Sequence, residues 1–479
     1  MSHAETDQLT ETFKRALDSI LARVFVCASQ PPVSSMAIGY SGGLDSSVLL
    51  HLARDYADDH GIRLHAFHVH HGLSANADAW LAHCQLVCEK LQIAFDSRKV
   101  LVAKEDGMGM EAAARMARYA ALGEMCREHR ASLLLTAHHQ DDQVETVLLQ
   151  MLRGAGLAGM SGMDEVNSAP DLLGDTAPLI ARPLLSVPRA ELAAFAEKLG
   201  IAHIEDESNL NLHHPRNALR KKVLPVLATH FPAYRDCLVR GAQHAQAAQR
   251  LLNELAIQDM AACADTQGWD EARDDGSVAG LKASLLESMS KDRAANLLRH
   301  WLLEQGMRPP STAWLDEALA QLLHSREDSQ ACVILDGQAV RCYRDRIVIT
   351  SVRAHTHVEP IVFRWQGETS LSFPGFTGNL HLDMVERGLD PAWLRGQSLR
   401  LQYRAGSTQS KPNPKLKLQS NRPAKALKEW YQERAIPAWE RPQLPLVYAG
   451  DTLLFAAGIG QDCRLPEASP GVVLRWFGN

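Results

Sequence analysis

The residues with the clearest chemical potential form a short loop between a predicted strand and a predicted helix. The loop has the sequence Ser41-Gly42-Gly43-Leu44-Asp45-Ser46. Glycines let the backbone adopt positive φ and approach a ligand closely, and the N–H groups that open a helix attract anions. The serine hydroxyls add further donors. The loop therefore predicts a phosphate-binding site, and the alternative is a tight turn in which a serine caps the helix.

Asp45 indicates how such a loop would hold a phosphate. A carboxylate repels a bare phosphate, so the sequence predicts that a Mg²⁺ ion bridges Asp45 to the phosphate oxygens. The loop lacks the lysine of the Gly-x-x-x-x-Gly-Lys phosphate loop and so belongs to another class.

A second group of acidic residues follows another predicted strand. Asp141 and Asp142 open the next predicted helix, and Glu145 lies four residues after Asp141, on the same helix face. Clustered carboxylates suit metal binding or the removal of a proton from an ammonium group. The alternative is that Asp142 only caps the helix and that Glu145 is a solvated surface charge.

Several histidines lie near the same predicted strand ends, namely His68, His70, His71, His138 and His139. No Cys-x-x-Cys or His-Glu-x-x-His spacing accompanies them, so a structural zinc site is not predicted. For His68 and His71 we expect neutral side chains that form hydrogen bonds in loops. The cysteines Cys84 and Cys88 are expected to be buried small hydrophobic residues, which disfavours sulfur-transfer chemistry.

Two groups of arginines are candidates for contacts with phosphate or RNA. Arg216 lies in the segment 213–222, which holds four Lys or Arg and no acidic residue. Arg115 and Arg118 lie on a predicted helix, where pairing of Arg115 with Glu111 is an equally good interpretation.

These motifs resemble those of known enzymes. Ser41–Ser46 resembles the motif Ser-Gly-Gly-x-Asp-Ser of the pyrophosphatase-loop family, whose members cleave ATP between the α and β phosphates and adenylate a substrate. More narrowly, segments 69–73, 137–146 and 206–220 resemble the tRNA(Ile)-lysidine synthase family. The resemblance covers most of residues 34–228 and recurs at 425–451.

The resemblance implies a reaction and its reactants. ATP would activate C2 of the wobble cytidine in the CAU anticodon of tRNA(Ile). The ε-amine of free L-lysine would then displace AMP to give lysidine.

The resemblance also implies a role for each site residue. The residues expected to bind ATP are Ser41, Gly42, Gly43, Leu44, Asp45, Ser46 and His70. Asp45 and Asp141 would hold Mg²⁺. The expected catalytic residues are Asp45, Asp141, Asp142, Glu145, His138 and Arg216.

The elements that must position these residues alternate between strand and helix. Predicted helices cover 5–27, 47–56, 76–91, 111–129, 142–152 and 189–199, and predicted strands cover 36–40, 63–69, 96–102, 132–136 and 201–204. The alternation predicts an α/β fold with a Rossmann-like, mainly parallel sheet. The strand order 3-2-1-4-5 would place strands one and four side by side, so that Asp45 faces Asp141 and Asp142 across one crevice.

The chain length predicts more than this one domain. At roughly 150 residues per domain, 479 residues suggest about three domains. We expect an adenylation domain with a linker helix over 1–232 and a largely helical domain over 233–356. The second domain is expected to have helices near 239–262, 281–304 and 313–324 and strands at 331–335 and 346–351. Residues 357–479 are expected to form a small α+β domain, with strands at 361–365, 369–373, 379–383 and 399–403 and a helix at 424–433.

Net charge alone argues against a uniformly basic nucleic-acid binder, because 50 Lys and Arg stand against 56 Asp and Glu. Residues 400–441, however, hold ten Lys or Arg and three Glu, a local charge of +7 that leaves −13 for the rest. Trp430, Tyr431 and Trp439 interleave with this charge. We expect the lysines to contact RNA and the tryptophans to belong to a small core, although a solvated basic face is the alternative.

The nine cysteines are spread along the chain and form no disulfide framework, so we expect a cytoplasmic protein. No run of about 18 apolar residues predicts a membrane span. Two rival functions stay open. One is an adenylating enzyme of the same loop family acting on another substrate, and the other is an ATP-responsive tRNA-binding protein without catalysis. The sequence does not predict an oligomeric state.

Overall fold

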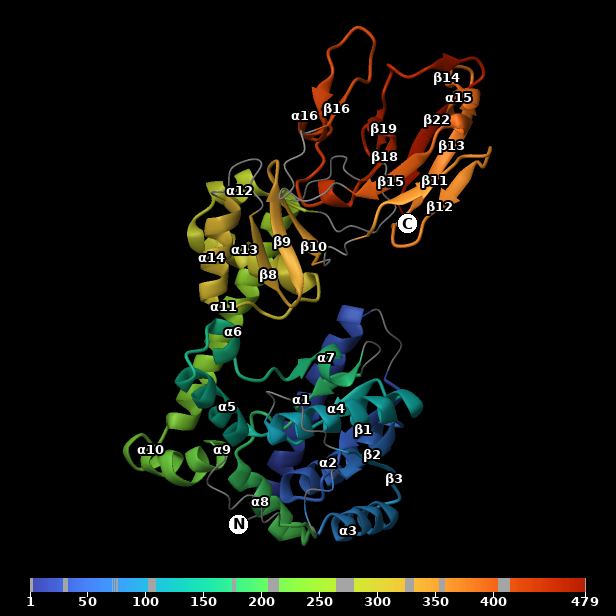
Figure 1. Ribbon diagram of the computed structural model, residues 1–479. Helices are drawn as coiled ribbons and strands as arrows, with labels where there is room; N and C mark the ends of the chain where they lie inside the picture. The colour runs from blue at the N-terminus through green and yellow to red at the C-terminus, as the bar shows by residue number, and fades with distance from the viewer. Residues whose placement is uncertain are drawn as a thin grey trace. The chain divides into compact units, whose positions relative to one another are not determined.

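The computed structural model describes residues 3–28, 33–70, 72, 74, 76–101, 109–174, 178–205, 215–263, 280–323, 331–352, 358–403 and 414–478. His71, the segment 206–209 and part of the basic C-terminal stretch lie outside these residues. The chain divides into two compact units, Met1–Leu251 (unit 1) and Leu252–Asn479 (unit 2), which are described separately (Figure 1). Among the described residues, no helix has the length and apolar character needed to cross a membrane.

Unit 1 is built on one six-stranded sheet with the order β3-β2-β1-β4-β6-β5. Its strands are β1 (Ser35–Gly39), β2 (Arg63–His70), β3 (Ala94–Lys99), β4 (Leu133–Leu135), β5 (Val166–Asn167) and β6 (Leu179–Ala181). All neighbouring strands pair in parallel except β5, which is antiparallel to β6. The predicted mainly parallel sheet and the adjacency of strands one and four are confirmed.

The fifth parallel strand differs from the prediction. It is β6, whereas residues 201–204 form no strand. Ile204 makes only an isolated parallel bridge to Gly43, with Ile204 N donating to Gly42 O at 2.8 Å. The prediction was wrong because β6 has only three residues between two prolines, too short to show a period, while Ile201 is buried for another reason, its packing in the helix-facing core.

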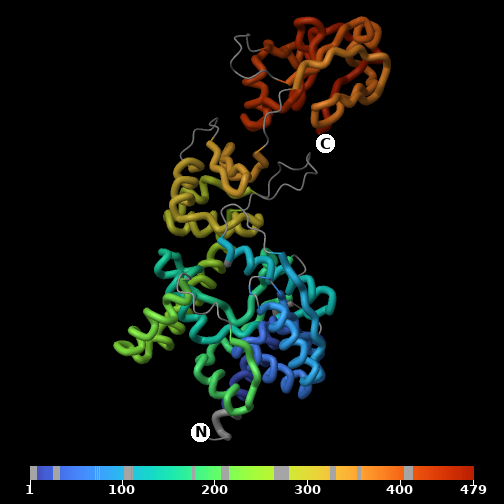
Figure 2. Tube along the Cα trace, turned by 60° about the horizontal axis from the view of Figure 1, so that its bottom comes forward, coloured from blue at the N-terminus to red at the C-terminus, as the bar shows by residue number. Residues whose placement is uncertain are grey.

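Helices cover both faces of this sheet (Figure 2). The longer helices of unit 1 are α1 (His3–Ala28), α2 (Leu44–His60), α3 (Ala77–Lys90), α4 (Met110–Glu128), α5 (Gln140–Leu152) and α8 (Arg189–Leu199), with short helices α6 (Leu157–Met160) and α7 (Pro170–Leu173). Successive strand residues point to opposite faces. Met36 and Ile38 therefore pack with α1, α2 and α8, while Ala37 packs with α4 and α7.

The last part of unit 1 is helical. It comprises α9 (Pro215–Ala218), a π-helical turn η2 (Leu219–Val223), α10 (Leu224–His230) and the start of α11 (Tyr234–Cys263). In both views α9 and α10 protrude from the side of unit 1 that is remote from β3 (Figures 1 and 2). The predicted linking helix over 217–227 is therefore confirmed, as part of a continuous helical stretch over 215–230 with a π-helical turn in its middle.

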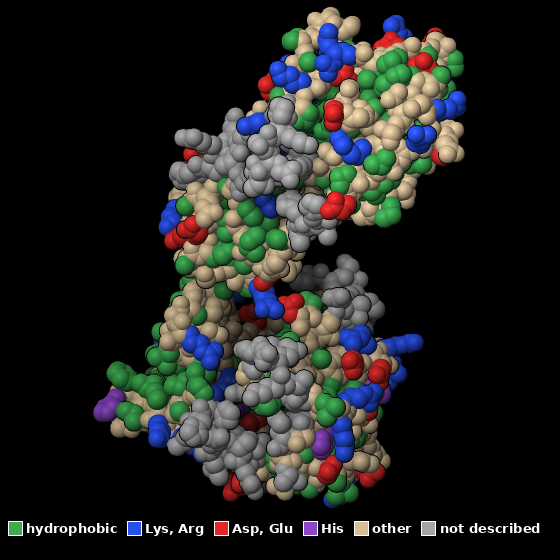
Figure 3. Space-filling model, in the orientation of Figure 1, with side chains coloured by type: hydrophobic (Ala, Val, Ile, Leu, Met, Phe, Trp, Pro, Cys, Tyr) green, Lys and Arg blue, Asp and Glu red, His purple; other side chains and the backbone are tan. Residues whose placement is uncertain are grey.

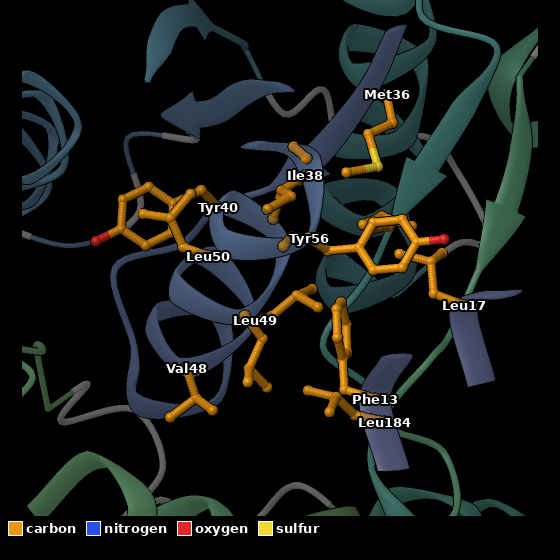
Figure 4. Close-up of a cluster of buried hydrophobic side chains, with 14 of the residues drawn as sticks. Phe13, Leu17, Met36, Ile38, Tyr40, Val48, Leu49, Leu50, Tyr56 and Leu184 are labelled. Carbon is orange, nitrogen blue, oxygen red and sulfur yellow. The ribbon is translucent and has the colours of Figure 1, made fainter. Parts of the chain in front are cut away.

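The core between α1, α2 and the sheet is closely packed (Figure 4). Phe13 is fully buried and meets Tyr56 edge to face, with ring centroids 6.3 Å apart. Leu17, Leu49 and Met36 complete the same cluster. Helix α1 is thus an integral layer of the α/β fold.

We expect Phe13→Ala to lower the free energy of unfolding of unit 1 by about 3–5 kcal/mol, because it leaves a cavity where no side chain can collapse. Phe231→Ala is the control, since Phe231 is 64% exposed and its removal should cost no more than about 0.5 kcal/mol. Urea titration monitored by far-ultraviolet circular dichroism measures the free energy of unfolding of both variants. Equal effects of the two substitutions would contradict the assignment of α1 to the core.

Unit 2 begins with helices packed on a small antiparallel sheet. The helices are α12 (Ala283–Ser288), α13 (Lys291–Glu304) and α14 (Thr312–Leu323), and the sheet order is β7-β10-β9-β8, with β7 (Leu281–Lys282), β8 (Cys332–Leu335), β9 (Gln338–Tyr343) and β10 (Arg346–Ser351). The predicted helices and the strands near 331–335 and 346–351 are confirmed. Strand β9 was not predicted, because its residues alternate poorly in polarity; it pairs with both neighbouring strands.

The rest of unit 2 consists mainly of two five-stranded antiparallel sheets, β11-β15-β18-β19-β20 and β12-β13-β22-β14-β21. The strands are β11 (Ile361–Phe363), β12 (Ser370–Ser372), β13 (Asn379–Val385), β14 (Gly388–Leu389), β15 (Leu399–Tyr403), β18 (Pro445–Ala449), β19 (Thr452–Ala456), β20 (Gly460–Gln461), β21 (Glu467–Ala468) and β22 (Gly471–Phe477); helix α15 spans Pro391–Gly396. The four predicted strands all exist.

A hairpin of β16 (Lys415–Leu416) and β17 (Lys425–Ala426) precedes α16 (Leu427–Glu433). Trp430 is buried and its Nε1 donates to Leu416 O at 2.9 Å, and Tyr431 is fully buried. The interpretation of Trp430 as a core residue is confirmed.

Candidate active site

The loop between β1 and α2 has the geometry of an anion-binding turn. Gly42 has φ +82°, and a Cβ there would lie 2.8 Å from Ile204 Cδ1 and 2.9 Å from Cys84 Sγ. Only glycine fits both constraints. Helix α2 begins at Leu44, earlier than predicted, so Asp45 lies in its first turn.

Hydroxyl groups line this turn. Ser41 Oγ and Ser46 Oγ are 3.0 Å apart, and Ser46 Oγ donates to Gly43 O at 3.0 Å. The N-cap residue is Gly43, and no side chain caps α2. The alternative in which a serine caps the helix is therefore wrong.

Asp45 lies at the centre of a charged contact set. Its Oδ2 is 3.7 Å from His139 Nε2 and its Oδ1 is 3.4 Å from Arg189 Nε. Oδ1 is buried and forms no hydrogen bond. Burial raises the pKa of Asp45, but the hydrogen bond to His139 and the charges of His139, Arg189 and Arg220 outweigh burial, so its pKa is lowered. Asp45 is thus an ionised carboxylate whose buried Oδ1 has a long ion-pair contact with Arg189 but no hydrogen bond, which fits a Mg²⁺ ligand.

His139 links Asp45 to the second acidic group. It is the N-cap of α5, and its Nδ1 accepts from Asp142 N at 3.3 Å while Asp142 Oδ2 accepts from His139 N at 3.2 Å. Because Nδ1 accepts, the ring proton is on Nε2, which lies 3.4 Å from Asp142 Oδ2. Burial lowers the pKa of His139, but Asp45 and Asp142 more than offset it, and the pKa is raised. The alternative role of Asp142 as a helix cap is confirmed.

Glu145 is fully buried, so the alternative of a solvated surface charge is wrong. Arg220 Nε and Nη2 lie 2.6 and 3.0 Å from its two oxygens, and Arg216 Nε lies 3.1 Å from Oε2. Arg216 also donates to Thr146 Oγ1 at 2.6 Å. Arg220 Nη2 further lies 3.4 Å from Asp142 Oδ1. The structure therefore brings the predicted residues Asp142, Glu145 and Arg216 together.

Asp141 connects α5 to two later helices. Its Oδ1 accepts from Arg235 Nε at 2.7 Å, and its Oδ2 accepts from Arg189 N, at the start of α8, at 2.9 Å. Burial raises the pKa of Asp141, but these two hydrogen bonds lower it by more, so the net shift of the pKa is downward. Since both oxygens are engaged, the contacts favour a positioning role for Asp141 over the predicted role in metal binding.

His138 faces the cationic side of the site. Its Nδ1 lies 2.9 Å from Thr136 Oγ1. Burial, followed by the charges of Arg182, Arg115, Arg216 and Arg118, lowers its pKa well below the ordinary value, so His138 is neutral at pH 7. Arg115 and Arg118 both stack on the buried ring of Tyr119, at 4.9 and 5.4 Å from its centroid. Neutral His138 and these arginines suit an anionic group.

The remaining predicted histidines have local partners. His70 is buried at the end of β2, and its Nε2 lies 3.3 Å from Asp78 Oδ1. Asp78, in the first turn of α3, is therefore the partner of His70 within the described part of the chain. His68 is buried within β2 rather than in a loop, and its Nδ1 lies 3.0 Å from Tyr40 O, so the expected hydrogen bond is present. Cys84 and Cys88 are buried, and burial raises the pKa of each thiol to about 12.

Comparison with known proteins identifies the family. A PP-loop domain model matches residues 9–227, a TilS substrate binding domain model matches 281–348, and a TilS substrate C-terminal domain model matches 399–476. The tRNA(Ile)-lysidine synthase of Burkholderia pseudomallei is 39% identical over 462 residues, covering 90% of each chain. The chain belongs to the tRNA(Ile)-lysidine synthase family.

The chain is also similar to a second synthase and to a solved structure. The tRNA(Ile)-lysidine synthase of Ralstonia nicotianae is 39% identical over 474 residues, which cover 96% of this chain and 97% of the relative. Among solved structures, the U34-tRNA thiolase NcsA from Methanococcus maripaludis is 18% identical, with a TM-score of 0.42, over 51% of this chain and 80% of that chain.

Four residues of the site were missing from the sequence prediction: His139, Arg189, Arg220 and Arg235. Arg220 could have been predicted, because it lies with Arg216 in the segment 206–220 that resembles the family. His139 lies three residues before Asp142 at a helix start, a spacing that indicates a capping box. Arg189 and Arg235 contact Asp45 and Asp141 only because α8 and α11 fold back onto α5.

We expect Arg220→Leu to cost about 3–5 kcal/mol of the free energy of unfolding, because Glu145 would keep a buried charge with one partner fewer. Adding Glu145→Gln to this variant should recover part of the loss, since the neutral amide needs no counter-charge. Arg240→Leu is the control at an exposed position. Purely additive losses in the double variant would contradict the buried pairing.

The lowered pKa of Asp141 predicts a pH dependence of stability. Its stabilising contribution is present above the unfolded pKa, about 3.9, and is lost as the pH falls through the lower folded value. The difference in free energy of unfolding between wild type and Asp141→Asn should be full at pH 7 and shrink below about pH 3.9. Urea titrations from pH 7 to pH 3 measure it, and a constant difference would refute the predicted pairing.

Proposed function

We propose that this chain is an ATP-dependent ligase that converts the wobble cytidine of CAU-anticodon tRNA(Ile) to lysidine, with release of AMP and pyrophosphate. One observation carries the proposal. Within a chain of this family, the loop Ser41–Ser46 places an ionised, partly buried Asp45 beside the acidic start of α5.

Residues Ser41–Ser46 would hold the triphosphate of ATP. The first-turn N–H groups of α2 face the phosphates, and the hydroxyls of Ser41 and Ser46 add donors. Asp45 would hold Mg²⁺ through Oδ1, which has no hydrogen bond. When bound, the ion neutralises charge on the departing pyrophosphate. Arg189, half exposed beside Asp45, is placed to pair with phosphate oxygens.

In the first step, cytidine O2 attacks the α-phosphorus and pyrophosphate leaves, which activates C2. Neutral His138 and the cluster of Arg115, Arg118 and Arg216 would face the anionic adenylate and the RNA backbone. In the second step the lysine ε-amine attacks C2 and AMP leaves.

The lysine ammonium must lose a proton before it attacks. Glu145 is paired with two arginines and Asp141 with Arg235, so neither carboxylate is free to accept a proton. Asp142 is the acceptor that this geometry favours, since beyond its cap bond from His139 N at 3.2 Å its contacts with Arg220 and the His139 ring are both at 3.4 Å. Asp141 and Glu145 then serve to position α8, α9 and α11 around it.

The C-terminal parts of the chain would bind the tRNA body. The exposed cations on the β16–β17 hairpin and α16 include Lys415, Arg422, Lys428 and Arg434, and Lys and Arg side chains gather over this hairpin in Figure 3. Such charges release counterions from the RNA backbone, so binding should weaken steeply with salt. We propose 1–232, 233–356 and 357–479 as the domains of the chain. We also propose a cytoplasmic location, because the proposed substrate is a tRNA.

We expect the protein to transfer labelled lysine to a CAU-anticodon tRNA(Ile) transcript when ATP and Mg²⁺ are present. Asp45→Ala should abolish both the label in RNA and the formation of AMP, because the phosphates lose their metal ligand. Asp55→Ala is the matched control, an exposed aspartate of α2 that pairs with Arg54 at the surface.

Other outcomes of this assay would support a rival function. Equal labelling of a CAU-anticodon tRNA(Met) would contradict the proposed specificity. Pyrophosphate release that needs no RNA would indicate adenylation of a small molecule, and RNA binding without any AMP would indicate a non-catalytic binding protein.

A further inference from the structure

Unit 2 contains a small hollow of about 110 Å³ that the proposed function does not use. Tyr343, Arg344, Arg346 and Val348 from the β9–β10 hairpin line it, together with Ala435, which follows α16. Pockets that enclose a drug-sized molecule have at least about 300 Å³. This hollow therefore has room for one planar ring rather than for a whole nucleotide.

The backbone around the hollow is held in an unfavourable conformation. Arg344, Asp345 and Ala435 have φ of +44°, +66° and +57°. A two-residue hairpin turn of this type usually takes Asn-Gly, because both central residues need positive φ. Here the Asp345 carboxylate accepts from Ser284 N at 2.5 Å and from Ser284 Oγ at 2.7 Å, which fixes the turn. Non-glycine residues held in this region cluster at ligand sites.

The chemistry of the walls suits an aromatic ring that carries an anionic group. Tyr343, Val348 and Ala435 offer apolar surface, and Arg344 and Arg346 bring guanidinium groups to the same hollow. Arg344 stacks over the Tyr343 ring at 5.7 Å and donates to Gln432 O, so its guanidinium is held in place. Bases stack on aromatic rings and guanidinium planes, while arginines neutralise the adjoining phosphate.

We propose that this hollow takes the base of an unpaired nucleotide of the RNA substrate. The proposal rests on the proposed function, in which that substrate is a tRNA. RNA is favoured over a free nucleotide because four of the five lining residues lie within 281–348, the segment matched by a substrate binding domain model. The hollow has room for one ring but not for a ribose and phosphate. This size also fits a base that is part of an RNA strand better than a free nucleotide.

Two variants of the full-length protein test this site in different ways. Val348→Phe fills the hollow and keeps its charge. Arg344→Gly removes one guanidinium and relieves the left-handed backbone, so it should not lower the melting temperature. Each should weaken binding of CAU-anticodon tRNA(Ile) at fixed salt by about fivefold or more, the value of one base stack. Arg308→Ala should change binding less than about twofold, because this exposed arginine lies between α13 and α14, beside the turn before β9 and roughly 20 Å from the hollow.

The outcomes separate the site from the proposed function. Unchanged tRNA affinity in both folded variants would overturn the site, and so would a loss of AMP binding without a loss of tRNA binding. Affinity is also compared with a tRNA trimmed of its single-stranded 3′ end. If the loss disappears with this tRNA, the bound base belongs to the 3′ end. If the loss persists, the base belongs to another unpaired nucleotide. Lysine labelling by the same wild-type preparation is measured in parallel: its absence would refute the proposed function, whereas labelling with unchanged affinities would refute only the site.

Discussion

The structure around the site depends on the balance of charge among four carboxylates that are crowded at the carboxyl ends of β1 and β4. Asp45, Asp141, Asp142 and Glu145 would repel one another and, when buried, would lose their charges unless cations were close by. Arginines supply that balance, and none of them comes from β1, β4 or the helices that follow these strands. They come from α8, α9, η2 and α11, which therefore have to close over the crevice.

This arrangement gives each carboxylate a different task although all four share one crevice. Glu145 is buried and fully engaged by arginines, and Asp141 bonds both to Arg235 and to the backbone that opens α8. Asp45 keeps an oxygen without a hydrogen bond, and Asp142 keeps only long contacts beyond its helix cap. The two residues with spare capacity are those that the proposed chemistry needs, one for Mg²⁺ and one for the proton of lysine.

Sequence reasoning predicted the parts of this structure that local patterns encode. The loop Ser41–Ser46 between a strand and a helix, the parallel sheet and the adjacency of β1 and β4 follow from periodicity and connection rules. Strand β6 was missed because three residues carry no period. The burial of Glu145 was missed because its partners, Arg216 and Arg220, come from 71 and 75 residues later in the chain, and only the fold brings them back.

The most direct measurement of the central claim is whether the protein forms an adenylated RNA that lysine consumes. ATP labelled at the α-phosphate is incubated with Mg²⁺, CAU-anticodon tRNA(Ile) and the protein without lysine, and the RNA is then isolated and mixed with fresh protein and lysine. The account predicts α-label in the RNA, no label from γ-labelled ATP, and release of the α-label as AMP when lysine is added. RNA without α-label, or α-label that lysine does not release, would contradict it.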